Sequence, residues 1–239
     1  MSGALGGKRV LIAGGSSGMG MAVATRAAAL GATVHVVGRS LARLAEARTA
    51  IGNDVVTHHA DISVESDVVT LAERIRQVDH IVTTAAELTF KHFTEISDAE
   101  IKTTFGAKFW GAVYLVRHFA SRIASNGSVT FFGGSAAYKA TAGASIVAAV
   151  NAALDGFART LAFELAPVRV NVVSPGTVET PAWDIMPEKE RAEVLKSIGA
   201  GLPVGRVGRP EELADAAIFL MTNGYATGTV LQIDGGTNA

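Results

Sequence analysis

The chain has 239 residues, of which 49% are hydrophobic and 18% charged, and its formal net charge is -1. These values describe a globular protein whose core can be stable without disulfides or metals. The near-neutral charge gives no electrostatic reason to expect nucleic acid or a membrane surface as a partner. The chain contains no cysteine, which excludes thiol catalysis and thiolate-bound metals, and we predict no metal site.

The sequence also indicates in which cellular compartment the protein is expected. The absence of a disulfide framework favours the cytoplasm, and the first ten residues lack the apolar run of a secretion signal. The longest uncharged stretch, residues 140–154, is shorter than the roughly 20 residues that a membrane span needs, so it is expected to form a core helix. The sequence therefore predicts a cytoplasmic protein with no membrane partner.

Residues 10–20, VLIAGGSSGMG, join a short apolar run to a glycine-rich turn. The apolar run predicts a strand buried on both faces of a parallel sheet, and a helix is expected to begin near Gly18. Glycines lack the Cβ that would hold a diphosphate away from the backbone, and N–H groups at a helix start face that anion. Such glycines also form ordinary tight turns, but the position between a first strand and a helix favours a dinucleotide site. The residues predicted to contact the cofactor here are Gly14, Ser16, Ser17, Gly18, Met19 and Gly20.

The residues after the second predicted strand indicate which dinucleotide is bound. Helices are expected over residues 19–30 and 41–51, and a strand over 33–37. An acidic residue after this strand would accept the ribose hydroxyls of NAD, whereas an arginine can pair with the 2′-phosphate of NADP. Arg39 and Ser40 stand here, so we predict NADP(H) in preference to NAD(H). The alternative is that Ser40 only caps the next helix and Arg39 is solvated.

The third predicted strand, residues 53–60, is followed by Asp61 and Ile62. Asp61 is a candidate contact for the adenine, and it is equally well explained as a turn residue at a strand end. Ser63 is expected to cap the following helix, which carries apolar residues at helical spacing.

The rest of the chain continues to alternate strands and helices. Ser97 and Glu100 predict a capping box at the head of a long helix. Ser135 follows the fifth strand, at the sheet edge where ligands of open α/β sheets bind. The remaining predicted strands are 79–86, 128–134, 168–173 and 228–233, and the remaining predicted helices are 97–123, 144–165, 188–197 and 211–221. This order, without an internal repeat, predicts an α/β fold: a Rossmann-type doubly wound parallel sheet in a single domain over residues 1–239.

Several segments of the chain, in this order, resemble the short-chain dehydrogenase/reductase family over nearly its whole length. They are GGSSGMG at the first turn, Ala60-Asp61 after the third strand, a serine after the fifth, and the runs VRVNVVSPGTVETP, GRPEEL and TGTVLQIDGG. The resemblance implies a nicotinamide cofactor and a small-molecule substrate with a carbonyl or alcohol group. Relatives commonly assemble as tetramers, which implies a homo-tetramer or dimer.

The resemblance also assigns further cofactor contacts. Pro175 and Gly176 are expected beside the nicotinamide, a backbone group of Val178 at its carboxamide, and Thr180 near the phosphates. The other residues expected at the cofactor on this basis are Ile62, Ala85 and Asn151.

The chain departs from the family pattern at the residues that handle the proton. Relatives use a tyrosine as proton donor, a lysine four residues later and a serine that orients the substrate oxygen. Ser135 matches the serine, but Val147 and Asn151 occupy the tyrosine and lysine positions. Val147 has no proton to give, and Asn151 is uncharged, although its amide can bond a ribose hydroxyl. No tyrosine of the chain is followed four residues later by a lysine.

Lys108 is the first candidate to replace the missing proton donor. It stands where relatives usually carry an asparagine, and a desolvated pocket would lower its pKa. The alternative is a solvated or interface lysine. Tyr138 and Lys139, just past Ser135, could also reach the site or simply face water. The charged residues that follow the fourth strand, on the substrate side by analogy but more simply solvated, are Glu87, Lys91 and His92.

These features favour an NADP(H)-dependent oxidoreductase with an atypical site. The alternative is a catalytically silent NADP-binding sensor or partner subunit of the same fold, and a third is non-redox chemistry such as isomerisation or dehydration. Residues 180–205 are expected to cover the substrate pocket. Their large apolar residues, which indicate an apolar substrate, are Trp183, Ile185, Met186 and Leu195.

Overall fold

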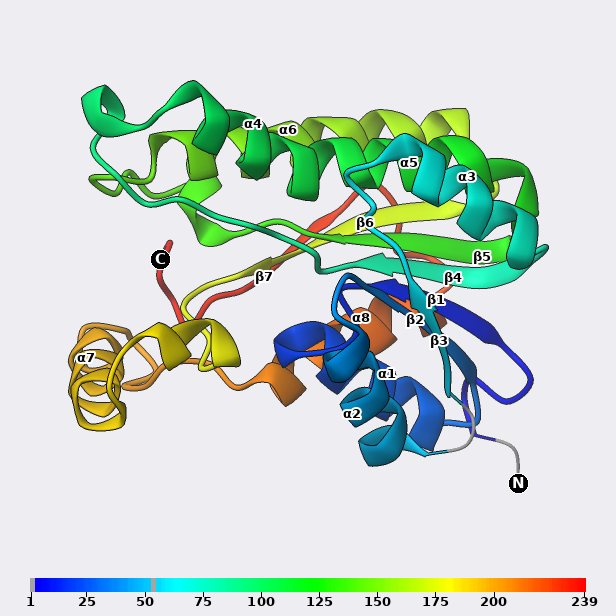
Figure 1. The fold of residues 1–239 in the computed structure, drawn as a ribbon, viewed down its shortest axis with the longest axis horizontal. Helices are drawn as coiled ribbons and strands as arrows, with labels where there is room; N and C mark the ends of the chain where they lie inside the picture. Colours follow the sequence, from blue (N-terminus) through cyan, green and yellow to red (C-terminus); the bar gives the residue numbers. More distant parts are fainter. Residues whose placement is uncertain (1–2, 53–54) are drawn as a thin grey trace.

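The computed structural model describes residues 3–52 and 55–239. Seven parallel strands form one sheet in the order β3-β2-β1-β4-β5-β6-β7, which is a doubly wound Rossmann-type arrangement (Figure 1). The strand order reverses between β1 and β4, so a ligand crevice is expected at the carboxyl ends of these two strands. The strands are β1 (Arg9–Ala13), β2 (Thr33–Gly38), β3 (Val55–His59), β4 (Val78–Thr83), β5 (Ile123–Phe132), β6 (Arg169–Pro175) and β7 (Val230–Ile233).

Helices cover both faces of this sheet. In Figure 1, α3, α4, α5 and α6 lie over one face, α1, α2 and α8 lie over the other, and α7 lies beyond the sheet on the side of the C-terminus. The helices are α1 (Gly18–Ala29), α2 (Leu41–Ile51), α3 (Glu65–Arg74), α4 (Asp98–Phe105), α5 (Gly111–Phe119), α6 (Ser145–Glu164), α7 (Glu188–Ala200) and α8 (Pro210–Thr222). Because both faces are covered, every residue of β4 and β6 is buried.

The core consists of two apolar clusters, one on each face of the sheet. Leu11 packs with Ile81 and Phe131 in one cluster, whereas its neighbour Ile12 packs with Val36 in the other. Successive side chains of a strand point to opposite faces, so a single apolar run supplies both clusters. Each fully buried side chain of this size stabilises the fold by roughly 1.5–3 kcal/mol.

The helix predicted over residues 97–123 is a continuous helical run with a π-turn inside it. The capping box at its head is confirmed: the N–H of Ser97 donates to Glu100, and the hydroxyl of Ser97 accepts from the N–H of Glu100. The run passes from α4 through a π-helix, Gly106–Trp110, into α5 and ends in a 3-10 turn. π-turns inside α-helices often occur at functional sites, and this one carries Lys108.

Several predicted boundaries and one predicted cap differ from the structure. β5 begins at Ile123 rather than at residue 128 and ends at Phe132 rather than at residue 134. Residues 53 and 54 of the third predicted strand lie outside the described residues, and β3 runs from Val55 to His59. β4 ends at Thr83 rather than at residue 86, since the chain turns there to line a cavity. The prediction that Ser63 caps α3 is wrong: Val64 stands at the N-cap position, because the Ser63 hydroxyl donates to the Asp61 carboxylate at 2.7 Å.

Of the described helices, α6 is the one long and apolar enough to cross a membrane by length and composition alone. Its buried residues include Leu154 and Ala158, which belong to the apolar cluster on the same face of the sheet as α3 and α5. α6 is therefore a core helix, as the uncharged run over residues 140–154 predicted, although the helix itself begins only at Ser145.

Candidate active site

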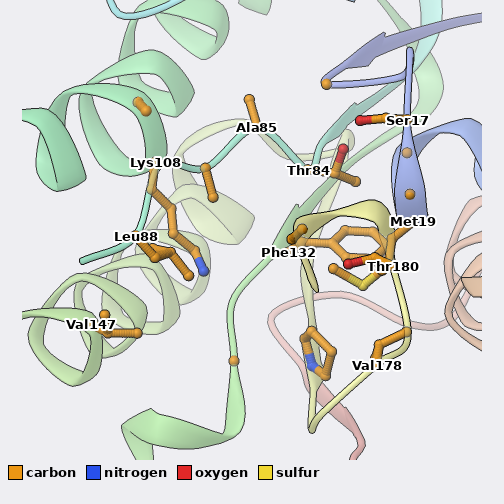
Figure 2. Close-up of a pocket in the computed structure, with 18 of the residues that line it drawn as sticks. Ser17, Met19, Thr84, Ala85, Leu88, Lys108, Phe132, Val147, Val178 and Thr180 are labelled. Carbon is orange, nitrogen blue, oxygen red and sulfur yellow. The ribbon is translucent and has the colours of Figure 1, made fainter. Parts of the chain in front are cut away.

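One large cavity of about 1230 Å³ opens at the carboxyl ends of the strands. It reaches from the glycine turn after β1 to the residues after β5 and β6 (Figure 2). All of the predicted site residues line it: Gly14, Ser16, Ser17, Gly18, Met19, Gly20, Arg39, Ser40, Asp61, Ile62, Ala85, Lys108, Ser135, Val147, Asn151, Pro175, Gly176, Val178 and Thr180. In Figure 2, Lys108, Leu88 and Val147 stand on one side of the cavity, and Ser17, Met19 and Thr180 on the other.

The glycine turn is close-packed against the loop after β4. A Cβ on Gly20 would lie 2.2 Å from the carbonyl oxygen of Gly14, and a Cβ on Gly14 would lie 2.7 Å from the N–H nitrogen of Ala85. Gly14 also has a φ of +82°, which residues with a Cβ rarely adopt. The Ser17 side chain at the start of α1 makes no capping bond. The turn thus offers a hydroxyl and helix-start N–H groups to an anion, and it fits the diphosphate of a dinucleotide.

Arg39 lies at the carboxyl end of β2 and is half-exposed. Its guanidinium donates to Glu87 at 2.9 Å and lies 3.9 Å from the carboxylate of Asp61. The Ser40 hydroxyl accepts the N–H of Arg43 at 3.3 Å, so Ser40 does cap α2. The Asp61 carboxylate accepts two bonds from Ser63, which makes it a turn residue. Arg39 is therefore not simply solvated, and it lies between two carboxylates at the cavity rim.

Lys108 is buried, with 7% of its surface exposed. Its Nζ donates to the backbone carbonyl of Gly133 at 2.8 Å. Burial lowers the pKa of Lys108 from 10.5 to about 8, and the Asp155 carboxylate opposes that shift. An ammonium has three donors, so two N–H bonds remain beyond the one to Gly133. The alternative of a solvated lysine is wrong, since the side chain is buried where it lines the cavity (Figure 2).

Val147 and Asn151 lie one turn apart on α6, and both are buried. The Asn151 amide donates to the Gly134 carbonyl at 3.4 Å. Its Oδ1 is buried and has no partner among the described residues. A buried acceptor without a donor is costly, so this oxygen fits a ligand hydroxyl such as that of a ribose.

Of the remaining candidate residues, one lines the cavity and the others do not. Lys139 lines the cavity and donates to the carbonyl of Thr237, whereas Tyr138 does not line the cavity and its hydroxyl donates to Asp155 at 2.6 Å. Glu87, Lys91 and His92 do not line the cavity: Glu87 pairs with Arg39, Lys91 with Glu100, and His92 with Thr94. Sequence reasoning missed Asp155, because one aspartate on an apolar helix carries no motif.

Large apolar residues also line the cavity. Of those predicted from the covering segment, Trp183, Ile185 and Met186 line the cavity. Leu195 does not; it is buried on the inner face of α7. The loop after β4 adds Leu88 and Phe90, which the sequence did not single out. The Trp183 indole donates to the Val178 carbonyl at 3.0 Å, which holds this side chain beside the turn after β6.

Known proteins resemble this chain in both sequence and fold. A family model described as enoyl-(acyl carrier protein) reductase matches residues 13–238. The chain is 32% identical to the short-chain dehydrogenase/reductase ATR9 of Stachybotrys chlorohalonatus, with 96% of each chain covered. It is 30% identical to the 3-oxoacyl-[acyl-carrier-protein] reductase FabG of Chlamydia pneumoniae, again over 96% of each.

A solved small-chain dehydrogenase in complex with NADPH superposes with a TM-score of 0.85 at 32% identity, covering 96% of this chain and 98% of that one. Fold, glycine turn and sequence thus agree over almost the whole length of the protein. The chain therefore belongs to the short-chain dehydrogenase/reductase family of NAD(P)-dependent oxidoreductases.

Proposed function

We propose that the protein is an NADP(H)-dependent oxidoreductase that acts on a carbonyl or alcohol group of a small apolar molecule, with Lys108 as its proton donor. The observation that carries this proposal is the Lys108 amine, which is buried, lies in the cavity and has a pKa of about 8. A general acid works best when its pKa is close to the operating pH. Val147 stands where relatives carry the tyrosine, and it has no proton to give.

The cofactor would lie along the cavity. Gly14, Gly18 and the free hydroxyl of Ser17 would hold its diphosphate, and Oδ1 of Asn151 would accept a ribose hydroxyl. The nicotinamide, when bound, supplies or accepts the hydride. Other contacts proposed from the family pattern are Met19, Ile62, Ala85, Pro175, Gly176, Val178 and Thr180, all of which line the cavity.

The preference for NADP(H) rests on Arg39. Its guanidinium would pair with the 2′-phosphate, and no acidic residue directly follows β2 to take the 2′-hydroxyl of NAD. The Glu87 carboxylate holds the same guanidinium at 2.9 Å. A phosphate must therefore compete with Glu87, and because the pair is exposed this competition costs little.

Lys108 and Ser135 would divide the work on the substrate oxygen. The Ser135 hydroxyl would hold the oxygen by a hydrogen bond. The Lys108 ammonium would give one proton to it during reduction and remain as a neutral amine, which burial tolerates better than the charge. In alcohol oxidation the neutral amine would take that proton back.

The substrate would lie against the large apolar residues that line the cavity. We propose that residues 180–205 cover it, because Trp183, Ile185 and Met186 face the cavity from this segment. Ile185 is 87% exposed, and a bound apolar molecule would remove such a side chain from water.

We also propose that the protein is a cytoplasmic homo-tetramer or dimer. Phe163 near the end of α6 is 87% exposed and Tyr225 after α8 is 99% exposed. Large apolar side chains exposed in this way support association with a second copy.

The test is NADPH oxidation with a panel of apolar aldehydes and ketones. We expect turnover with at least one member, and slower turnover with NADH. Binding of NADPH without turnover of any member would favour the alternative function, a silent NADP-binding sensor or partner subunit, which the valine at position 147 supports. Substrate consumed without loss of NADPH absorbance would instead indicate non-redox chemistry.

A double variant distinguishes the two main functions further. Val147→Tyr with Asn151→Lys restores the pair that relatives use. If the parent is silent, activity should appear only in this variant. If Lys108 is the working acid, the parent is already active and the double variant changes its pH profile.

A further inference from the structure

Asp155 and Tyr138 form a polar pair outside the lining of the cavity. The Tyr138 hydroxyl donates to the Asp155 carboxylate at 2.6 Å, although 17 residues separate them along the chain. Asp155 is 5% exposed, whereas Tyr138 is 45% exposed. Neither residue lines the cavity, so neither is placed to contact a substrate.

The backbone of Gly133 connects this pair to Lys108. Gly133 accepts the Lys108 amine through its carbonyl at 2.8 Å. A Cβ on the same glycine would lie 3.6 Å from Oδ1 of Asp155, so the carboxylate lies against the residue that holds the amine. Within residues 3–52 and 55–239, Lys108 forms no ion pair shorter than 4.0 Å. The Asp155 charge therefore acts on Lys108 through space, and the amine stays in the cavity.

Few other charges act on these groups. On the helical run of α4 and α5, on β5 and on α6, the group whose charge raises the pKa of Lys108 is Asp155. Burial raises the pKa of the Asp155 carboxyl, and Tyr138, Arg159 and Lys108, which it faces, each oppose that rise and favour the charged carboxylate. The arrangement keeps a negative charge next to a buried amine.

We propose that Asp155 is a positioning residue that keeps the Lys108 amine protonated, and that the Tyr138 hydroxyl holds Asp155 in place. This inference rests on the proposed function, in which Lys108 is the proton donor. Burial alone favours the neutral amine, which has no proton to give. A direct ion pair would draw the amine out of the cavity and hold its proton more tightly. The Asp155 carboxylate avoids both effects, because Gly133 lies between it and the Lys108 amine.

The test is an NMR titration of the lysine side chains, isotopically labelled, in the full-length protein. Lys108→Met identifies the Lys108 signal. We expect Asp155→Asn to lower the pKa of Lys108 by about one unit, which is a tenfold drop in the ratio of protonated to neutral amine. Asp155→Glu retains the charge and should restore most of the shift. Glu164→Gln is the matched control, since it removes an exposed carboxylate from the far end of the same helix, and it should change nothing.

A reciprocal titration covers the case in which Asp155→Asn does not fold. Two coupled groups shift each other equally, so Lys108→Met should raise the pKa of the Asp155 carboxyl, followed by its carbon signal. An unchanged Lys108 pKa in folded Asp155→Asn, or an unchanged Asp155 pKa in folded Lys108→Met, would overturn the inference.

Activity gives an independent readout. In Asp155→Asn the high-pH limb of kcat for reduction should move to lower pH by the same amount as the Lys108 pKa. The titrations need no turnover, so they separate the two proposals. If the pKa values of Lys108 and Asp155 depend on each other but the protein reduces no carbonyl, the proposed function is contradicted and the coupling stands. If the protein reduces a carbonyl but the two pKa values are independent, only the further inference is contradicted.

Discussion

The two ends of the cavity are built in different ways. The end proposed to hold the diphosphate is made of backbone: Gly14 and Gly20 pack so closely that a Cβ has no room, and the ligand would meet N–H groups. The chemical end is made of side chains on three elements, the π-turn with Lys108, the segment after β5 with Ser135, and α6 with Asn151. Backbone contacts serve any nucleotide of the same shape, whereas side chains can be exchanged one at a time. We propose accordingly that the chain keeps the family pattern at the first end and departs from it at the second.

The largest expected effect is at the chemical end. Lys108→Met should lower kcat for carbonyl reduction by about 10²–10⁴-fold, the usual contribution of a general acid, and leave NADPH affinity nearly unchanged. In the wild type, kcat should fall tenfold per pH unit above a pH of about 8, since only the ammonium can donate, and the variant should lack this limb. Lys102→Met removes an exposed lysine from the same helical run and serves as the control. Equal loss of NADPH affinity would show that Lys108 only supports the cofactor site.

The same substitution should stabilise the fold. The pKa of Lys108 falls from 10.5 in a solvated chain to about 8 in the folded one, so between these values the unfolded state binds the extra proton. The stability of the wild type should therefore rise with pH from about 8 to 10.5, by roughly 3 kcal/mol at most. At pH 7 Lys108→Met should be more stable by about 1–3 kcal/mol and lack this rise. Urea unfolding of both proteins at several pH values measures the difference in the free energy of unfolding. A variant less stable than the wild type at pH 7 would show that the buried Lys108 charge does not destabilise the fold.

At the backbone end, Gly20→Ala should weaken NADPH and NADH equally. Its Cβ would lie 2.2 Å from the Gly14 carbonyl oxygen, so the turn must shift. Overpacking costs roughly 1–3 kcal/mol, which corresponds to about 5- to 150-fold in affinity if the cost falls on the turn. Gly156→Ala on α6 is the control, because a Cβ there meets nothing within 4 Å. Titration calorimetry measures both, and unchanged affinity in Gly20→Ala would contradict the proposed diphosphate site.

The smallest expected effect concerns cofactor choice. Glu87→Gln frees Arg39 from an exposed ion pair worth about 0.2–1 kcal/mol, so affinity for NADPH should rise by about 1.4- to fivefold. Affinity for NADH, which has no 2′-phosphate, should stay the same. Glu95→Gln, an exposed carboxylate further along the same loop, is the control. An equal gain for both cofactors would mean that Arg39 does not face the 2′-phosphate.

Local patterns in the sequence determined the fold and the position of the glycine turn, where we propose that a diphosphate binds. Apolar runs with strand and helix periods predict the doubly wound sheet. The glycines stand between the first predicted strand and the first predicted helix, so their place in the sequence already locates the turn that joins these two elements. Ser97 and Glu100 likewise predict a cap that needs nothing beyond four consecutive residues.

Only the tertiary structure decided what the chemical end contains. Whether Lys108 faces water or the cavity depends on a π-turn and on the Gly133 carbonyl of another element. The pairs Arg39 with Glu87 and Tyr138 with Asp155 join residues 48 and 17 positions apart. Such contacts leave no periodic trace in the sequence, because each depends on how separate elements pack rather than on neighbouring residues.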